Sequence, residues 1–372
     1  MIRANHKLSF FDKLVLYTNY LFVLALLISY LAPVTDPKNF WPVAFFGLGY
    51  PVLLFMNALF IVYWLFRVKL YVLVSVIGIL IGWKVLNNNI GFHRSVFDGP
   101  KADTSDIRMM AYNVHAFYSF DFTKEVPTKH QIFKIIEDEK PDIINFEEFY
   151  SRSKGAFDIV DSIKTLLKSN QYYFEAFDKN KDDMQGLAIF SKFPVINHGM
   201  IRLNNDNSDN QCIYADLQTK TKTIRVYCVH LQSIHFESQD YVYLDSVAHE
   251  GKPNLHNSKR LGSKLKLAFI KRSEQVHLIK QHMAQCPYPY IVAGDFNDTP
   301  TSYAVNEMAS GLKNTFYEKG SGLARTYNGD FPNFQIDYIM ASQQFNVVNY
   351  EVIENKGKLS DHYAVRSDLQ LK

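Results

Sequence analysis

Two long segments in the first hundred residues contain no charged residue: residues 14–35 and residues 39–66. A helix of about 20 apolar residues crosses the hydrocarbon core of a bilayer, so each segment is long enough to span a membrane. A charged side chain at the centre of a bilayer costs roughly 2.5–3.5 kcal/mol on insertion scales, which is why spanning helices rarely contain one. The pattern therefore predicts membrane-spanning helices near the N-terminus.

A third apolar segment, residues 70–83, reaches a spanning length only when it continues past Lys84. A cleaved signal peptide followed by core helices is the alternative, but it explains only the first segment, and no small-residue cleavage site is present. We therefore predict that residues 1–100 form an all-α membrane anchor for which the lipid bilayer is the partner. Its three transmembrane helices are expected at about residues 14–34, 42–66 and 68–86.

The charge distribution separates this region from the rest of the chain. Residues 1–100 hold eight basic and three acidic residues, a charge of +5, whereas the remainder holds 32 basic and 34 acidic residues, a charge of −2. With three spans, the flanking basic residues divide into Arg3, Lys7, Lys13, Arg67 and Lys69 on the side of the N-terminus, and Lys38, Lys84, Arg94 and Lys101 on the other. Because basic flanks favour the cytoplasm, we expect an integral membrane protein with residues 101–372 on the extracytoplasmic side. The orientation reverses if the third segment does not span.

Residues 101–372 alternate short apolar runs with amphipathic segments. We expect strands at residues 107–114, 142–149, 186–196, 211–218, 223–231, 291–295, 334–340 and 362–371, and helices at residues 128–140, 156–170 and 264–283. A polar segment, residues 236–262, is expected to be an inserted loop or lid. Strands in hairpins mixed with a few helices favour an α+β fold with packed sheets over a doubly wound parallel sheet.

Reactive polar side chains lie at the ends of these expected strands. Each has an ordinary explanation by itself; an Asp-x-Asn sequence after a strand, for example, is a common turn. Their repeated occurrence at strand ends, in one order along the chain, instead indicates a single site at one edge of the sheets. These side chains are Asn113, Glu148, His230, Asp295 with Asn297, Asp337, and Asp361 with His362.

This series resembles the endonuclease/exonuclease/phosphatase superfamily, which includes DNase I-like nucleases, neutral sphingomyelinases and inositol-polyphosphate 5-phosphatases. The resemblance covers about Ile107 to Lys372 through seven ordered motifs: "YNV", "PDIINFEE", "GLAIFSKFPVI", "VHLQS", "GDFND", "IDYIM" and "LSDHYAV". It implies a four-layered α/β sandwich, with two packed β-sheets flanked by helices and the active site at one edge. It also implies metal-dependent hydrolysis of a phosphate ester.

The resemblance also implies a role for each residue. The metal-binding set would be Glu148, the neighbouring Asn113, and Asp361, with Mg²⁺ or Mn²⁺ as the ion. In the catalytic set, His362 would be the general base or a phosphate-binding residue, and Asp337 the carboxylate that orients it. Asp295 and Asn297 would be the pair that positions water and stabilises the pentavalent phosphorus. His230 would stabilise charge or assist the leaving group. These residue types suit the chemistry, because Mg²⁺ prefers oxygen ligands and histidine titrates near neutrality.

Two positions depart from the family pattern. Glu147 stands where the family usually has glutamine, and this extra carboxylate would recruit a second metal, repel an anionic substrate or point away from the site. Gln335 stands before "IDYIM", where the family often has arginine, which puts local phosphate contacts in question.

The substrate is the least determined part of the prediction. Nucleic-acid binding requires a basic surface, and the only compact basic cluster in the acidic part of the chain is residues 257–266. We predict a membrane-anchored, metal-dependent phosphodiesterase that acts on nucleic acid or a lipid head group. The alternatives are a phosphomonoesterase of the inositol-phosphate type and a catalytically silent membrane receptor or scaffold. No protein partner is indicated.

Overall fold

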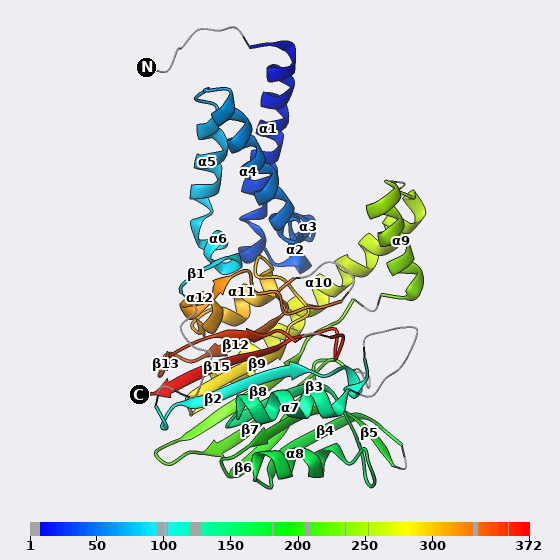
Figure 1. Cartoon of the computed structure of the whole chain (residues 1–372), viewed down its shortest axis with the longest axis vertical. Coiled ribbons are helices and arrows are strands. Elements are labelled where there is room, and N and C mark those ends of the chain that lie inside the picture. Colours follow the sequence, from blue (N-terminus) through cyan, green and yellow to red (C-terminus); the bar gives the residue numbers. More distant parts are fainter. Residues whose placement is uncertain are drawn as a thin grey trace.

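The computed structural model describes residues 8–94, 101, 103–119, 128–180, 182–204, 209–234, 236–251, 253–329, 334–355 and 357–372. In Figure 1 the chain forms two parts, a bundle of helices at the N-terminus and a sandwich of β-sheets from which the bundle projects. The helical elements of the N-terminal part are α1 (Phe10–Ser29), η1 (Ala32–Val34), α2 (Pro37–Phe40), α3 (Pro42–Leu48), α4 (Tyr50–Phe66), α5 (Val72–Ile81) and α6 (Trp83–Asn89).

Among the described residues, one helical segment, residues 10–34, is long and apolar enough by itself to cross a membrane. The number rises to three if α3 with α4, and α5 with α6, each count as one bent span. The predictions of single helices at residues 42–66 and 68–86 are therefore wrong, because the two pairs bend by 60° and 75°.

Local sequence explains the first bend, and a tertiary contact accompanies the second. The first lies at Gly49, just before Pro51, which has no N–H to donate to the preceding turn. The second lies at Gly82, where an added Cβ would stand 2.0 Å from the ring of Tyr30. Only glycine allows the two helices to approach so closely.

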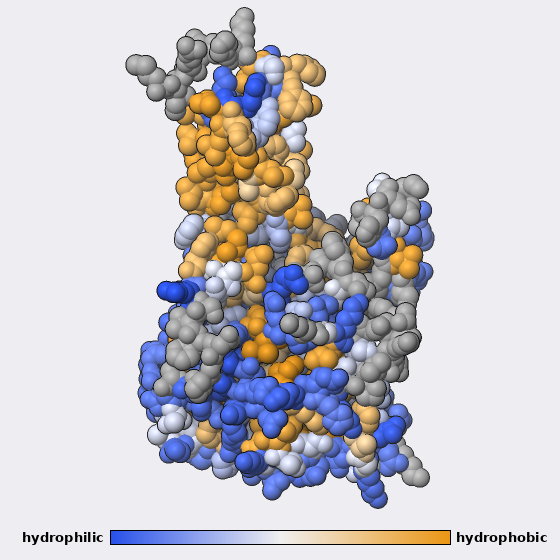
Figure 2. Space-filling view, in the orientation of Figure 1, coloured by the Kyte–Doolittle hydropathy of each residue, from blue (hydrophilic) through white to orange (hydrophobic). Residues whose placement is uncertain are grey.

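Three helices of the bundle are joined by buried polar side chains. Asn19 of α1 donates to Ser75 of α5 at 2.7 Å, and Ser75 donates to Asn57 of α4 at 2.9 Å. The indole of Trp64, also on α4, donates to Asn19 at 3.1 Å. The outer surface of the bundle is strongly hydrophobic (Figure 2). A hydrophobic exterior around a few interhelical hydrogen bonds is typical of helices that associate in lipid.

Two sheets make up the sandwich. The first sheet has the order β10 (Lys313–Asn314), β12 (Asp337–Ala341), β9 (Tyr290–Asp295), β8 (Thr223–His230), β7 (Gln211–Gln218) and β6 (Val195–Ile201). The second has the order β13 (Phe345–Val347), β15 (Ala364–Leu371), β2 (Ile107–Asn113), β3 (Ile143–Arg152), β5 (Asp183–Ser191) and β4 (Gln171–Lys179), with β14 (Glu351–Ile353) also paired to β15. A short pair, β1 (Gly91–Phe92) and β11 (Ser321–Gly322), lies beside them.

Helices cover the outer face of each sheet. The second sheet packs on α7 (Lys129–Glu139) and α8 (Ile159–Leu167), and the first on α10 (Leu255–Ala284) and α11 (Tyr303–Ala309). Alternation along β2 shows how the layers form: Met109 and Ala111 enter the core between the sheets, whereas Met110 and Tyr112 face the helices. The predicted α+β fold, with two mixed sheets flanked by helices, is confirmed. The remaining described helices are η2 (His115–Phe117), α9 (Ser238–Glu250) and α12 (Thr315–Lys319).

Some element predictions were wrong. The single strand expected at residues 186–196 is two strands in different sheets, β5 and β6, separated by a turn that contains Pro194. Strand β4 was missed. The loop or lid expected at residues 236–262 is largely helical, because α9 occupies residues 238–250 and α10 begins at Leu255, where the Asn254 side chain caps its first turn.

The bundle is fixed to the sandwich by specific contacts. Asn89 of α6 donates to Thr301 at 3.0 Å, and Ser273 of α10 donates to Asp36 at 2.7 Å. The ring of Phe45 in α3 meets that of Phe269 in α10 edge-on, with centroids 5.4 Å apart. The helical part therefore has a defined position relative to the sandwich.

Candidate active site

The sheet registers bring most of the predicted side chains to one edge of the sandwich. Strands β8 and β9 are parallel, and His230 at the end of β8 lies opposite Asp295 at the end of β9. Strand β12 is antiparallel to β9, so its first residue, Asp337, also lies opposite Asp295. In the second sheet Asn113 ends β2, and its side chain donates to Asp295 across the sandwich at 3.2 Å.

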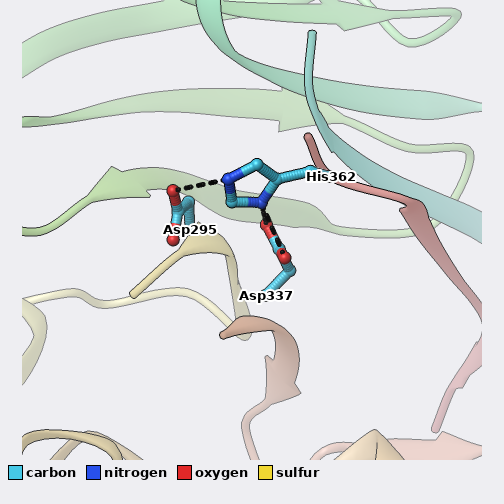
Figure 3. Close-up of side chains that lie close together, drawn as sticks. All are labelled: Asp295, Asp337 and His362. Atoms are coloured by element: carbon cyan, nitrogen blue, oxygen red, sulfur yellow. Dashed lines mark hydrogen bonds and ion pairs between the residues drawn. The ribbon is translucent and has the colours of Figure 1, made fainter. Parts of the chain in front are cut away.

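His362 lies between two carboxylates (Figure 3). Its Nδ1 is 3.1 and 3.0 Å from the two oxygens of Asp337, and its Nε2 is 3.7 Å from Asp295. Burial alone would lower the pKa of His362, but the charges of Asp337, Asp295 and Asp361 together raise it well above its ordinary value. The three carboxylates therefore favour the charged ring, and Asp337 fixes the proton on Nδ1.

Asp295 is the centre of the hydrogen-bond network. Its carboxylate accepts from the backbone N–H of Asn297 at 2.7 Å and from the Asn297 and Asn113 amides at 3.2 Å each. The Nε2 atoms of His230 and His362 both lie 3.7 Å away, which is too long for a hydrogen bond and leaves both nitrogens available to a substrate. Burial raises the pKa of Asp295, although the two histidines oppose that effect.

A β-bulge directs Glu148 into the site. Side chains three residues apart in a regular strand face opposite sides, yet Phe146 and Phe149 lie in the same core cluster. The β3–β5 register shifts between them, and Glu148 has a positive φ of 50°. The irregular residue brings the Glu148 carboxylate to the sheet edge, where the Asn113 amide donates to it at 3.2 Å.

His115 is a site residue that the sequence prediction missed. Its Nδ1 lies 3.5 Å from Glu148 and 3.7 Å from Asp361. It follows β2 in a turn where residues 115–117 all have positive φ, so the strand-end pattern does not point to it. Its position two residues after Asn113 is the one signal that the sequence offers. The hydrogen bond to Glu148 raises the pKa of His115.

The oxygen ligands around Glu148 and Asp361 fit a divalent cation. Burial alone would raise the pKa of Glu148, but the hydrogen bond from His115 and nearby histidine charges lower it to about 2. Burial raises the pKa of Asp361, and the negative charge of Glu148 adds to that effect. Two neighbouring carboxylates form a donor set that a hard cation would stabilise, while the Asn113 amide presents its nitrogen to Glu148 and its oxygen accepts from the His115 N–H.

A second group, Asp295, Asp337 and His362, has one potential ligand atom from each residue within 4.8 Å of the others. We favour the Glu148 side for the metal, because both oxygens of Asp337 already contact Nδ1 of His362. An ion in the second group would have to break that pair.

The extra carboxylate, Glu147, points away from the site. Its side chain is fully buried between the sheets, where the Cys228 thiol donates to it at 3.2 Å. Burial raises the pKa of Glu147 well above its ordinary value and thereby favours its neutral form. A neutral Glu147 has nearly the shape and charge of the glutamine that the family usually has there.

A family model described as "Endonuclease/Exonuclease/phosphatase family" matches residues 110–362, more than half of the chain. The chain belongs to this family. It is accordingly a hydrolase of phosphate esters, and family members generally depend on a divalent metal ion. A second model, a domain of unknown function (DUF8431), matches residues 12–89. A search of curated proteins found no significant match.

Solved structures share the sandwich fold. An endonuclease/exonuclease/phosphatase from Bacteroides vulgatus is 16% identical, with a TM-score of 0.54 over 72% of this chain and 100% of the other. A mannosyl-6-phosphatase from Bacteroides thetaiotaomicron is 16% identical, with a TM-score of 0.50 over 71% and 99%. The catalytic domain of human Nocturnin is 19% identical, with a TM-score of 0.50 over 73% and 96%. At these identities the likeness concerns the fold alone.

Proposed function

We propose that this protein is a membrane-anchored, divalent-metal-dependent phosphodiesterase. The observation that carries the proposal is the convergence of His362, Asp337 and Asp295 with Glu148 and Asp361 at one sheet edge. A catalytically silent receptor on the same fold would be expected to have lost at least one of these residues, and all are present.

Glu148 and Asp361 would hold Mg²⁺ or Mn²⁺, and Asn113 would join them once its side-chain amide turns its oxygen, which accepts from the His115 N–H in this structure, toward the ion. The ion supplies positive charge that stabilises the phosphate oxygens as negative charge builds up on them. His115 contacts both carboxylates and would either join this set or be displaced by the ion.

The remaining residues would act on water and phosphate. The charged ring of His362 donates from Nε2 to a phosphate oxygen, while Asp337 holds Nδ1. Asp295, whose burial raises its pKa and makes it a better base, accepts a proton from the attacking water. The water oxygen bonds to phosphorus, the bond to the leaving oxygen breaks, and the Asn297 amide and His230 stabilise the charge that develops.

We further propose that residues 1–100 are the anchor, residues 101–372 the catalytic domain, and the catalytic side extracytoplasmic. Asp12 pairs with Arg67 at the end of the bundle far from the sandwich, at 2.7 Å, and Lys13 and Lys69 are close to them in sequence. Arg3 and Lys7 of the charge argument lie outside the described residues. Protease treatment of sealed right-side-out vesicles should cleave the catalytic domain; cleavage only after the vesicles are opened would reverse the assigned orientation.

The proposed activity is tested with the full chain in detergent and Mg²⁺, on supercoiled plasmid, phosphatidylcholine, sphingomyelin and bis(p-nitrophenyl) phosphate. Turnover of at least one of these phosphodiesters should disappear with chelator and in both Glu148→Ala and His362→Ala. A matched control is Asp368→Asn, which removes a buried carboxylate paired with Arg108 away from the site. Turnover that survives in His362→Ala would refute the assigned site.

A further inference from the structure

A single cavity connects the catalytic residues with the base of the helical bundle. Its volume is about 490 Å³, within the range of pockets that bind small molecules. Its lining includes the candidate catalytic residues, among them Glu148, Asp295 and His362. The same cavity is also lined by a set of apolar residues from α3, α9, α10 and the segment before α9, which we name the apolar arm: Leu48, Phe236, Leu244, Leu261, Leu265 and Phe269.

The apolar arm is assembled from three separate parts of the chain. Leu261, Leu265 and Phe269 lie four residues apart, so they form one stripe along α10. Leu244 comes from α9, the helix that precedes α10. Leu48 is the last residue of α3 in the bundle, so the N-terminal part contributes to the lining of the same cavity that contains the candidate active site.

Charge in the cavity argues against a polyanionic substrate. Among the described lining residues, Arg272 is the one lysine or arginine, and it lies 3.3 Å from Asp298 and donates to the Gln232 carbonyl. Recognition of a nucleic-acid backbone normally uses several basic groups along the groove. The apolar arm instead offers a surface that only an apolar group can occupy without losing hydrogen bonds to water.

The arm also lies where a bilayer surface would be if the bundle spans the membrane. In Figure 1, α9 and the first half of α10 project beyond the sandwich beside the bundle, and Figure 2 shows the hydrophobic surface of the bundle reaching down to the sandwich. The exposed side chains of this projection include Val242 and Leu255, with exposed fractions of 69% and 70%. Exposed apolar residues next to an apolar bundle fit an element that contacts lipid.

We propose that the substrate is a membrane lipid with a phosphodiester head group. Its phosphate lies at His362 and Asp295, and its apolar chain lies in the apolar arm. This inference rests on the proposed phosphodiesterase function and names the substrate class for the same site. The cavity links the bilayer side of the molecule to the catalytic residues, so a lipid reaches them with its chain still covered by apolar side chains.

The test uses the full chain in one detergent with Mg²⁺ and a series of p-nitrophenyl alkyl phosphodiesters with ethyl, hexyl and decyl chains. Hydrolysis adds one water, breaks the P–O bond to the aryl group and releases p-nitrophenolate with alkyl phosphate. We expect kcat/KM to rise by about fourfold for each methylene group that enters the arm. From hexyl to decyl this amounts to roughly two orders of magnitude.

Two neighbouring leucines on α10 provide a matched pair of variants. Leu265→Gln places an amide in the arm and should remove most of the dependence on chain length, lowering kcat/KM for the decyl ester about tenfold or more. Leu267→Gln changes a side chain that is 55% exposed and outside the cavity, so the dependence should persist. Because both variants share detergent and substrate, partition of the ester into micelles cannot explain a difference between them.

The outcomes separate this inference from the function on which it rests. Turnover of all three esters at one rate, or equal chain-length dependence in both variants, would overturn the lipid substrate and leave the phosphodiesterase standing. Plasmid nicking that is faster than decyl ester hydrolysis and unaffected by Leu265→Gln would overturn it in favour of a nuclease. Failure of folded, Mg²⁺-loaded protein to hydrolyse any phosphodiester would overturn both proposals.

Discussion

Replacement of Asp337 by asparagine tests the charge state in which His362 works. Asp337 contacts Nδ1 of His362 through both oxygens, at 3.1 and 3.0 Å. At 3.0 Å and an effective dielectric constant of about 20, this attraction favours the charged ring by about 5 kcal/mol, from which the cost of burial is subtracted. Asparagine keeps the shape and removes the charge, so the pKa of His362 must fall.

The sign of the pH effect follows from the proposed role. Since the charged ring binds phosphate, activity is lost as the pH rises through the pKa of His362, which the three carboxylates hold above its ordinary value. Asp337→Asn should therefore move the alkaline limb of the kcat/KM profile to lower pH. Above the lowered pKa, the loss should be about 10²–10³-fold, the usual effect of removing one donor to a developing oxyanion. Below it the loss should be much smaller.

The assay is hydrolysis of bis(p-nitrophenyl) phosphate at fixed Mg²⁺ from pH 5.5 to 9.5. Asp368→Asn controls for the loss of a buried carboxylate, because it removes the partner of Arg108 and should leave the limbs in place. Thermal unfolding of both variants separates misfolding from chemistry. A shift of the acidic limb, with activity rising as His362 loses its proton, would show that the neutral ring acts as a general base and would refute the assigned charge state.

Three further predictions concern the metal, the buried acid and the bundle. Glu148→Ala and Asp361→Asn should each weaken Mn²⁺ binding, as measured by electron paramagnetic resonance without any substrate; unchanged affinity would move the ion to another group. Glu147→Gln should keep kcat within about twofold. It should also become more stable relative to wild type as the pH rises above 4.5, because the pKa of Glu147 is higher in the folded than in the unfolded protein and wild type therefore loses stability as the pH rises. A constant difference in Tm between pH 5 and 8 would contradict the raised pKa. Asn19→Leu removes the acceptor of Trp64 and the donor to Ser75, and should destabilise the bundle by about 1 kcal/mol in an SDS titration; an unchanged titration would show that the two hydrogen bonds contribute nothing.

The strand pattern was enough to predict that these polar side chains meet at one edge of the sheets. His230, Asp295 and Asp337 each end or begin an apolar run, and strand pairing then forces them to one edge of a sheet. The sequence predicted that Glu148 lies at a strand end, but not the direction of its side chain, because that direction depends on a bulge that strand alternation does not predict. His115 was missed, since a turn with positive φ and not a strand carries it to the carboxylates.

The bends of the bundle show that amino-acid composition does not predict where an apolar helix is interrupted. The length of the charge-free runs identified the apolar segments correctly, but it does not show whether each segment is one continuous helix. Pro51 interrupts the backbone hydrogen bonds of one segment, and the approach of Tyr30 to Gly82 is a contact between distant parts of the sequence. A glycine two residues before a proline was a visible signal for the first bend, whereas the second requires the tertiary structure.

The apolar arm cannot be predicted from local sequence patterns, and it gives the N-terminal region a proposed role beyond anchoring. Leu48, Leu244 and Leu265 are separated by up to 217 positions, and each by itself reads as an ordinary apolar residue of a helix. They become one surface only because α3 bends away from α4 and packs on α10 through Phe45 and Phe269. A straight second span would carry Leu48 away from the cavity. The bend that divides the segment expected as one helix is thus the feature that joins the bundle to the candidate site, and under the proposed function it makes the N-terminal region part of substrate recognition and not only a tether.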